Sequence, residues 1–118
     1  VVWVGTNDIF QGGDAISMYS DLTTYVSNRQ SAGWTVAVMT IPPTVYPNPP
    51  MDTVRTDFNS LILGNSAGAD ITLDAAALPL LQDPNDSTYR TADGVHYKPA
   101  GYSLIADLVR PSIQALYP

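Results

Sequence analysis

The sequence predicts an α/β fold in which helices flank a parallel sheet. Residues 1–4 are uniformly apolar, which is typical of a strand covered on both faces. Two further β-rich runs lie at 35–41 and 69–73. Apolar residues at helical spacing lie between and after these runs. The resulting order, β-α-β-α-β-loop-α, favours about three parallel strands and three helices joined by right-handed crossovers.

Two of the expected helices lie between the strands. The first runs from about residue 15 to 29, with Asp14 as its N-cap. The second follows a surface loop, 42–50, that holds five prolines, and Gly64 is expected just past its end. Their apolar faces are expected to consist of Ile16, Tyr19, Leu22 and Val26 in the first helix, and Val54, Phe58, Leu61 and Ile62 in the second.

The last part of the chain is a polar loop followed by a helix. Residues 82–97 are turn-rich, and helical spacing returns from Pro99 to about Tyr117. Pro111 should kink or divide this helix, because proline removes a backbone donor and clashes with the preceding turn. The apolar positions of the helix are Leu104, Leu108, Ile113 and Leu116.

Composition narrows the class of protein. A chain of 118 residues is expected to form one domain, 1–118. Its net charge of −6, with only five scattered basic residues, argues against nucleic acid and acidic membrane surfaces as partners. No apolar stretch approaches the ~20 residues of a membrane span. The absence of cysteine excludes disulfides and thiolate sites. Low charge content with many Tyr, Ser and Thr resembles the surface of a secreted protein.

The first strand has few candidate neighbours in this chain. Sequential βαβ units would leave residues 1–4 at one side of a three-stranded sheet, with unpaired backbone groups. The chain also opens inside an apolar run without a starting Met. We therefore expect a processed, truncated or split product, whose open edge is covered by a missing N-terminal segment, a second chain or a homodimer partner.

A first candidate for chemistry is the segment Gly5-Thr6-Asn7-Asp8, which directly follows the first strand. Ligands of open α/β sheets gather beyond the carboxyl ends of strands. The amide of Asn7 could donate a hydrogen bond to a developing oxyanion, an effect worth ~3–4 kcal/mol in known cases. The alternative interpretation is a plain turn, since Gly, Asn and Asp are common turn residues.

A second candidate is Asp93-Gly94-Val95-His96, immediately before the last helix. His96 is the only histidine, and imidazole is the usual proton shuttle near neutral pH. Asp93 can fold back within one turn and hold a ring nitrogen of His96. The alternative is an exposed loop histidine beside a capping aspartate. A metal site is a third option, but one histidine with scattered carboxylates is a poor ligand set, and no cofactor motif is present.

Together these segments resemble the SGNH (GDSL-type) hydrolases. The family carries Gly-x-Asn-Asp after its third strand and Asp-x-x-His before its last helix. Here VVWVGTNDI (1–9) and DGVHYKPAGY (93–102) are similar to those blocks. The resemblance implies a three-layer, flavodoxin-like parallel sheet of order 2-1-3-4-5, whose strands 1 and 2 are missing from this chain. It also implies that Asn7 is an oxyanion-hole donor supported by Gly5 and Asp8, that His96 is the general base, and that Asp93 orients it.

The chain departs from that family at the nucleophile. No Gly-Asp-Ser occurs in the sequence, and the family's second-block glycine cannot be placed. None of the serines is a convincing substitute, and Ser87, in the loop before His96, is the least unlikely. No nucleophile is therefore assigned within the chain.

Three functions are compatible with these observations. The first is a Ser-His-Asp hydrolase of carboxylic esters, acetyl or short acyl groups on carbohydrate among them, whose serine comes from outside this chain. The second is a stand-alone dimeric hydrolase that pairs through its first strand and acts on ester or glycosidic bonds. The third is a non-catalytic binding domain in which Tyr46, Tyr89 and Tyr97 line a sugar-binding surface.

Overall fold

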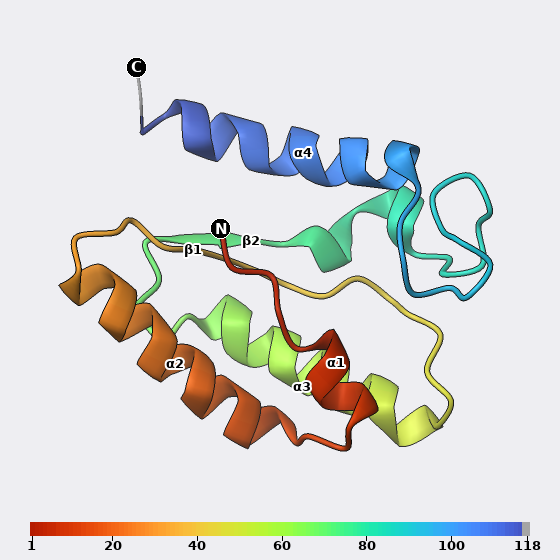
Figure 1. The fold of residues 1–118 in the computed structure, drawn as a ribbon, viewed down its shortest axis with the longest axis horizontal. Helices are drawn as coiled ribbons and strands as arrows, with labels where there is room; N and C mark the ends of the chain where they lie inside the picture. Colours follow the sequence, from red (N-terminus) through yellow and green to blue (C-terminus); the bar gives the residue numbers. More distant parts are fainter. Residues whose placement is uncertain (117–118) are drawn as a thin grey trace. The chain divides into compact units, whose positions relative to one another are not determined.

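The structure is a computed structural model that describes residues 1–116. It divides into two compact units. The first unit consists of residues 1–41 and 46–74, and the second consists of residues 42–45 and the chain from 75 onward. Figure 1 shows that the first unit combines helices with a short sheet, so the α/β class is confirmed.

The sheet is smaller than the sequence predicts. Strands β1 (Ala37–Met39) and β2 (Ile71–Leu73) pair in parallel, and Val38 lies opposite Thr72. Residues 1–4 were expected as a third strand, but they contribute only a single parallel bridge from Val2 to the other edge of β1. The N–H of Val2 donates to the carbonyl of Ala37 at 2.7 Å, and its carbonyl accepts from Met39 at 3.0 Å. The prediction of a three-stranded sheet was wrong because the chain turns into a helix after Val4, before a second pair of bonds forms.

That helix, α1 (Thr6–Phe10), replaces the loop that the sequence predicts after the first strand. Gly5 starts it with φ of 111°, a left-handed conformation that favours glycine. A Cβ at this position would lie 2.9 Å from Cε1 of Phe58 and 3.0 Å from Cδ1 of Ile41. Glycine is therefore required both by the backbone conformation and by the close approach of the core.

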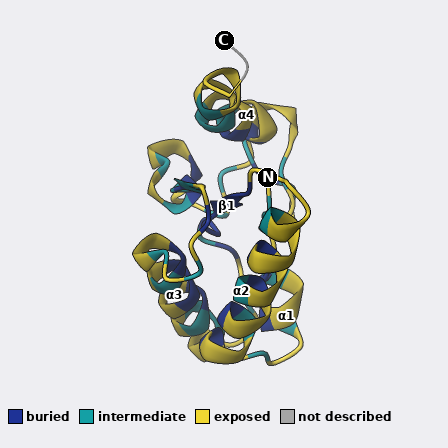
Figure 2. Ribbon diagram, turned by 90° about the vertical axis from the view of Figure 1, so that its left-hand side faces the viewer, coloured by how far each residue is buried: buried dark blue, intermediate teal, exposed yellow. Residues whose placement is uncertain are grey.

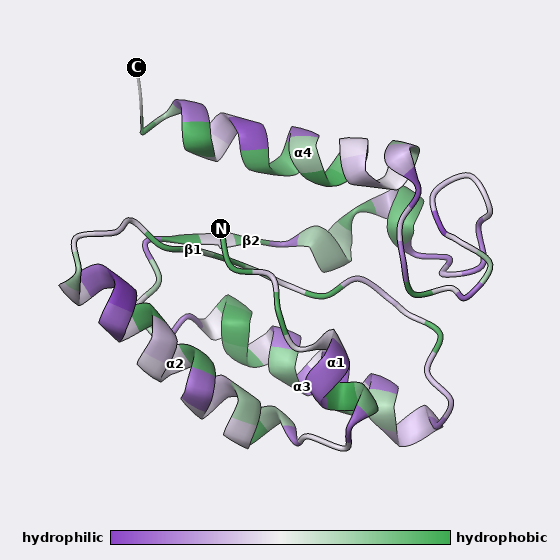
Figure 3. Cartoon of the chain, viewed as in Figure 1, coloured by the Kyte–Doolittle hydropathy of each residue, from purple (hydrophilic) through white to green (hydrophobic). Residues whose placement is uncertain are grey.

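Helix α2 (Ala15–Ser31) begins where the sequence predicts. The carboxylate of Asp14 accepts from the backbone N–H groups of Ile16 and Ser17 at 3.1 and 3.0 Å, which confirms it as the N-cap. Tyr19, Leu22 and Val26 are buried as predicted, but Ile16 is 70% exposed and does not belong to the apolar face. Figure 2 shows the buried side of α2, and Figure 3 the alternation of polar and apolar residues along it.

Helix α3 (Pro49–Gly64) begins inside the segment predicted as a proline loop, with Pro49 and Pro50 in its first turn. Gly64 is the last helical residue rather than the one past the end, and Asn65 takes the left-handed conformation there (φ 50°). Phe58 and Ile62 are buried and pack with α2 residues in one apolar core. This core holds α1, α2, α3 and the sheet of the first unit together.

The second unit contains little regular structure before its helix. Two short 3₁₀ turns, η1 (Ala75–Ala77) and η2 (Pro79–Leu81), precede the predicted polar loop. Helix α4 (Pro99–Gln114) follows the loop and contains Pro111 without being divided by it. Its buried residues are Gly101 and Ile105, whereas the predicted Ile113 and Leu116 are exposed. The predicted helix end at Tyr117 lies outside the described residues.

No helix within residues 1–116 is both long and apolar enough to cross a membrane.

Candidate active site

The loop that carries Asp93 and His96 is closed by backbone bonds at its base. Arg90 and Tyr97 form an antiparallel bridge. Just inside it, the N–H of Thr91 donates to the carbonyl of His96 at 2.9 Å, and the N–H of Gly94 donates to the carbonyl of Thr91 at 3.0 Å. Six residues, 91–96, therefore form a closed loop that holds the two candidate side chains, Asp93 and His96, on one short segment.

Asp93 and His96 are in direct contact. Oδ2 of Asp93 lies 2.7 Å from Nδ1 of His96. The other carboxylate oxygen, Oδ1, accepts three hydrogen bonds: from Oγ1 of Thr91 at 2.6 Å, and from the backbone N–H groups of Val95 and His96 at 2.8 and 3.0 Å. The predicted spacing of an aspartate three residues before the histidine thus produces the expected contact, with one oxygen fixed by the loop and the other facing the imidazole.

These hydrogen bonds hold the pKa of the Asp93 carboxyl well below its ordinary value. The bond from the Thr91 hydroxyl has the largest effect, followed by the His96 side chain and the backbone N–H groups of Val95 and His96. Each donor favours the ionised form of the carboxyl. Asp93 is therefore a carboxylate over the whole range in which enzymes ordinarily work.

The pair is open to solvent, with 48% of the Asp93 side chain and 72% of the His96 side chain exposed. An exposed ion pair contributes little to stability, because water screens it and the side chains lose freedom. The orientation of His96 must therefore come from the bonds that fix Asp93. With Nδ1–H donated to the carboxylate, the lone pair of a neutral imidazole is on Nε2, the atom a general base needs.

Arg90 is a buried side chain that packs against this loop and bonds its backbone. Its side chain is 1% exposed, although arginine is rarely buried. Its guanidinium donates to the carbonyl of Val95 at 2.8 Å and to the carbonyl of Pro43, and lies 3.8 Å above the ring of Tyr97. The N–H of Val45 adds a bond to the carbonyl of Gly94 at 3.3 Å. Segment 42–45 is thereby tied to the His96 loop within the second unit.

The other predicted site residues, Gly5, Asn7 and Asp8, lie together in the first unit. Asn7 and Asp8 are exposed and lie in the short helix α1, so the predicted loop is a single helical turn, which leaves both the oxyanion-donor and the backbone interpretations open. The carbonyls of both residues cap the helix end by accepting from the N–H of Gln11. The convergence of Asn7 with His96, which belongs to the second unit, stays a prediction.

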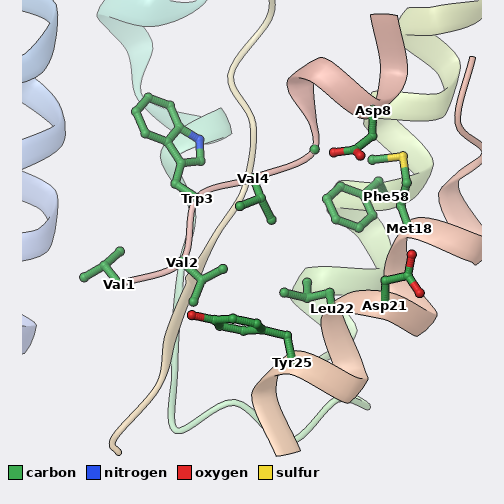
Figure 4. Close-up of a pocket in the computed structure, with 11 residues that line it drawn as sticks. Val1, Val2, Trp3, Val4, Asp8, Met18, Asp21, Leu22, Tyr25 and Phe58 are labelled. Carbon is green, nitrogen blue, oxygen red and sulfur yellow. The ribbon is translucent and has the colours of Figure 1, made fainter. Parts of the chain in front are cut away.

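Beside residues 1–5 the first unit has a hollow of about 510 Å³. Its walls are mainly apolar, and Figure 4 shows Val4, Met18, Leu22 and Phe58 on them, with the carboxylates of Asp8 and Asp21 nearby. Val1 and Val4 are 59% and 51% exposed, which is unusual for valines of a buried sheet. The segment predicted to need a covering neighbour is thus apolar, accessible and next to a hollow.

Three of the remaining predicted candidates, Ser87 through its backbone and Tyr46 and Tyr97 through their rings, make defined contacts. The carbonyl of Ser87 accepts from Nζ of Lys98 at 2.6 Å, in the loop before His96. The ring of Tyr46 packs on Phe10 with centroids 5.1 Å apart, and that of Tyr97 lies 5.7 Å from Tyr102. No cluster of three or more metal-ligating side chains occurs within the described part of the chain.

Sequence reasoning missed Thr91 and Arg90. A threonine two residues before an aspartate that heads a turn is a detectable signal, because hydroxyls commonly bond within such turns. Nothing in the sequence marks Arg90, since an arginine in a polar loop is ordinarily exposed. Comparison with models of known protein families and with curated proteins gives no match for this chain.

Proposed function

We propose that the chain is the C-terminal part of an SGNH-type hydrolase of carboxylic esters, acetyl or short acyl groups on carbohydrate among them. The nucleophilic serine comes from outside the 118 residues. The observation that supports the proposal is the 2.7 Å contact between Asp93 Oδ2 and His96 Nδ1, made within a segment that resembles the family's final block.

The chemistry assigns one role to each group. Nε2 of His96 takes the proton of the incoming serine hydroxyl as its oxygen attacks the ester carbonyl, and Asp93 stabilises the imidazolium that forms. The imidazolium then gives the proton to the departing alcohol, leaving an acyl-serine. Water attacks this acyl group, with His96 again taking the proton and returning it to the serine oxygen. The products are the alcohol released in the first half and the carboxylic acid released in the second, and the enzyme is regenerated.

Asn7 would act on the oxyanion of the tetrahedral intermediate. Its side-chain amide makes no hydrogen bond to another residue within 1–116, and Gly5 and Asp8 shape the helical turn that presents it. In the complete protein, strands before Val1 would cover the hollow beside residues 1–5 and enlarge the sheet to the flavodoxin-like order. This completion would also bring the serine toward His96.

The decisive experiment compares the purified 118-residue chain with a form extended upstream, using an aryl acetate as substrate. The extended form is expected to hydrolyse the ester, and His96→Ala to remove the activity. Asn7→Ala should lower kcat by ~10²–10³, the effect of losing one oxyanion donor. The matched control is Asn28→Ala, which replaces an exposed asparagine on α2 and should leave kcat unchanged.

A fluorophosphonate probe separates the alternatives, because it labels activated serines covalently. Label on a serine upstream of Val1 supports the proposal. Label on Ser87, or His96-dependent activity of the chain alone as a dimer, replaces it with the stand-alone hydrolase. A folded, extended form that neither hydrolyses aryl esters nor takes the label leaves only the binding domain.

The convergence of the two segments has its own test. Because residues 1–118 contain no cysteine, Asn7→Cys combined with Ala92→Cys introduces the only two thiols within them. A short bismaleimide should cross-link this pair in the extended form. Ser31→Cys with Ala92→Cys, in which the first thiol sits at the far end of α2, should not cross-link. Equal yields for both pairs would contradict the shared cleft.

A further inference from the structure

The oxygen Oδ1 of Asp93 receives an unusual share of the hydrogen bonds in this loop. Two of its three donors are backbone N–H groups of the turn itself, from Val95 and His96. The third is a side chain, Oγ1 of Thr91, and it makes the shortest of the three bonds at 2.6 Å. Thr91 is thus the side chain that holds Oδ1 in place from outside the turn.

Thr91 also bonds the backbone of His96, the second residue of the pair. Its backbone N–H donates to the carbonyl of His96 at 2.9 Å, and its hydroxyl lies 3.2 Å from the same carbonyl. A hydroxyl has one hydrogen, and the charged, closer oxygen of Asp93 is the stronger acceptor. One residue therefore positions the carboxylate through its side chain and the histidine through its backbone.

We infer that Thr91 is a positioning residue that keeps Oδ2 of Asp93 on Nδ1 of His96 and so selects the imidazole tautomer with its lone pair on Nε2. The part that Thr91 would play in catalysis rests on the proposed function. The positioning of Asp93 and His96 by Thr91 does not. Because both partners are exposed, no packed wall restricts the carboxylate. Rotation of the carboxylate would break the Thr91 bond, the shortest of the three to Oδ1, together with the two backbone bonds.

Removal of the Thr91 hydroxyl should have a specific effect on His96. Thr91→Val keeps the shape and the backbone bonds but deletes the one side-chain donor, so the carboxylate is held less firmly against the ring by its two remaining backbone donors. His96 should then shift toward the Nε2–H tautomer. Thr91→Ser retains the hydroxyl and should behave like the wild type. In the extended enzyme, Thr91→Val should lower kcat by about 10–100-fold, the usual effect of losing a group that orients a functional side chain, with KM unchanged.

The test is ¹⁵N NMR of the two ring nitrogens of His96 in the 118-residue chain, a measurement that needs no activity. The wild type should show the Nδ1–H form, and Thr91→Val a smaller fraction of it. Thr88→Val, an exposed threonine in the same polar loop, is the matched control and should leave the ring unchanged. If Thr91→Val does not fold by circular dichroism, Thr91→Ala carries the same test.

The outcomes separate this inference from the proposed function. A wild-type Nδ1–H tautomer that Thr91→Val does not alter overturns the role of Thr91 and leaves the hydrolase proposal intact. A wild-type ring in the Nε2–H form shows that the contact between Asp93 and His96 is absent in solution. This second outcome also overturns the inference about Thr91. Loss of the tautomer in Thr91→Val with retention in Thr91→Ser supports it, even if the extended protein hydrolyses no ester.

Discussion

Replacing Gly94 with alanine should destabilise the loop that carries Asp93 and His96. Gly94 has φ of 66°, in the left-handed region, and a Cβ there would lie 2.3 Å from Cγ2 of Val45 and 3.1 Å from the carbonyl oxygen of Pro84. The substitution therefore adds two costs. A left-handed L-residue costs ~1–2 kcal/mol, and forcing an extra group into a filled space costs ~1–3 kcal/mol. The expected loss is about 2–5 kcal/mol.

Gly68 provides a matched control, because its φ of 69° is nearly the same but no atom lies within 4 Å of its Cβ position. Gly68→Ala should show only the conformational cost of ~1–2 kcal/mol. Each free energy of unfolding is measured by urea denaturation followed by far-UV circular dichroism, with the m-value checked for constancy. Tryptophan fluorescence gives a second probe for the first unit, because Trp3 and Trp34 both lie there.

A double mutant isolates the contact with Val45. Val45→Gly should recover the clash component of Gly94→Ala, because it removes both the Cγ2 and the Cβ atoms that obstruct the new methyl group. If Gly94→Ala costs no more than Gly68→Ala, or if Val45→Gly rescues nothing, then Val45 does not pack on this loop and the explanation is incorrect.

Two further substitutions test the first unit. Asn59→Leu should lower the free energy of unfolding in urea by about 2–4 kcal/mol. The buried Asn59 amide bonds both the N–H and the carbonyl of Ile41 at 2.8 Å, and leucine leaves that N–H without a partner. An unchanged midpoint would contradict this prediction, and Asn28→Leu on the surface is the control. Asp14→Ala should destabilise α2 at neutral pH. The pKa of Asp14 is lowered, chiefly by the backbone N–H of Ser17, so its contribution is present above the unfolded pKa and is lost as the pH falls through the lower folded value. The difference in melting temperature between the two proteins should therefore shrink in acid, and a constant difference down to the lowest pH would contradict the cap.

The local elements were predictable because their causes lie within a few residues of sequence. Asp14 caps α2 through N–H groups two and three positions away, and the run from Ala69 to Leu73 contains β2. The contact of Asp93 with His96 belongs to the same class, since three residues of separation bring the side chains together in one turn. Ile16 was misplaced because helical spacing alone does not say where the apolar face ends.

The extent of the sheet was not predictable from apolar content. Residues 1–4 have the composition of a buried strand, but strand pairing requires a neighbour along the full length, and Gly5 turns the chain into α1 at once. The helical turn at Thr6–Phe10 was hidden because it is too short to show a periodic pattern. Boundaries set by backbone geometry therefore differ from boundaries set by hydropathy.

By itself the sequence indicated the α/β class, the approximate positions of α2, α3 and α4, and a spacing that lets Asp93 reach His96, since all of these follow from local pattern. Only the tertiary structure decided that Arg90 is buried beneath the His96 loop and that Val45 occupies the space next to Gly94. The contact between Arg90 and Pro43 spans 47 residues, and such contacts depend on how the whole chain folds back rather than on any short pattern within it.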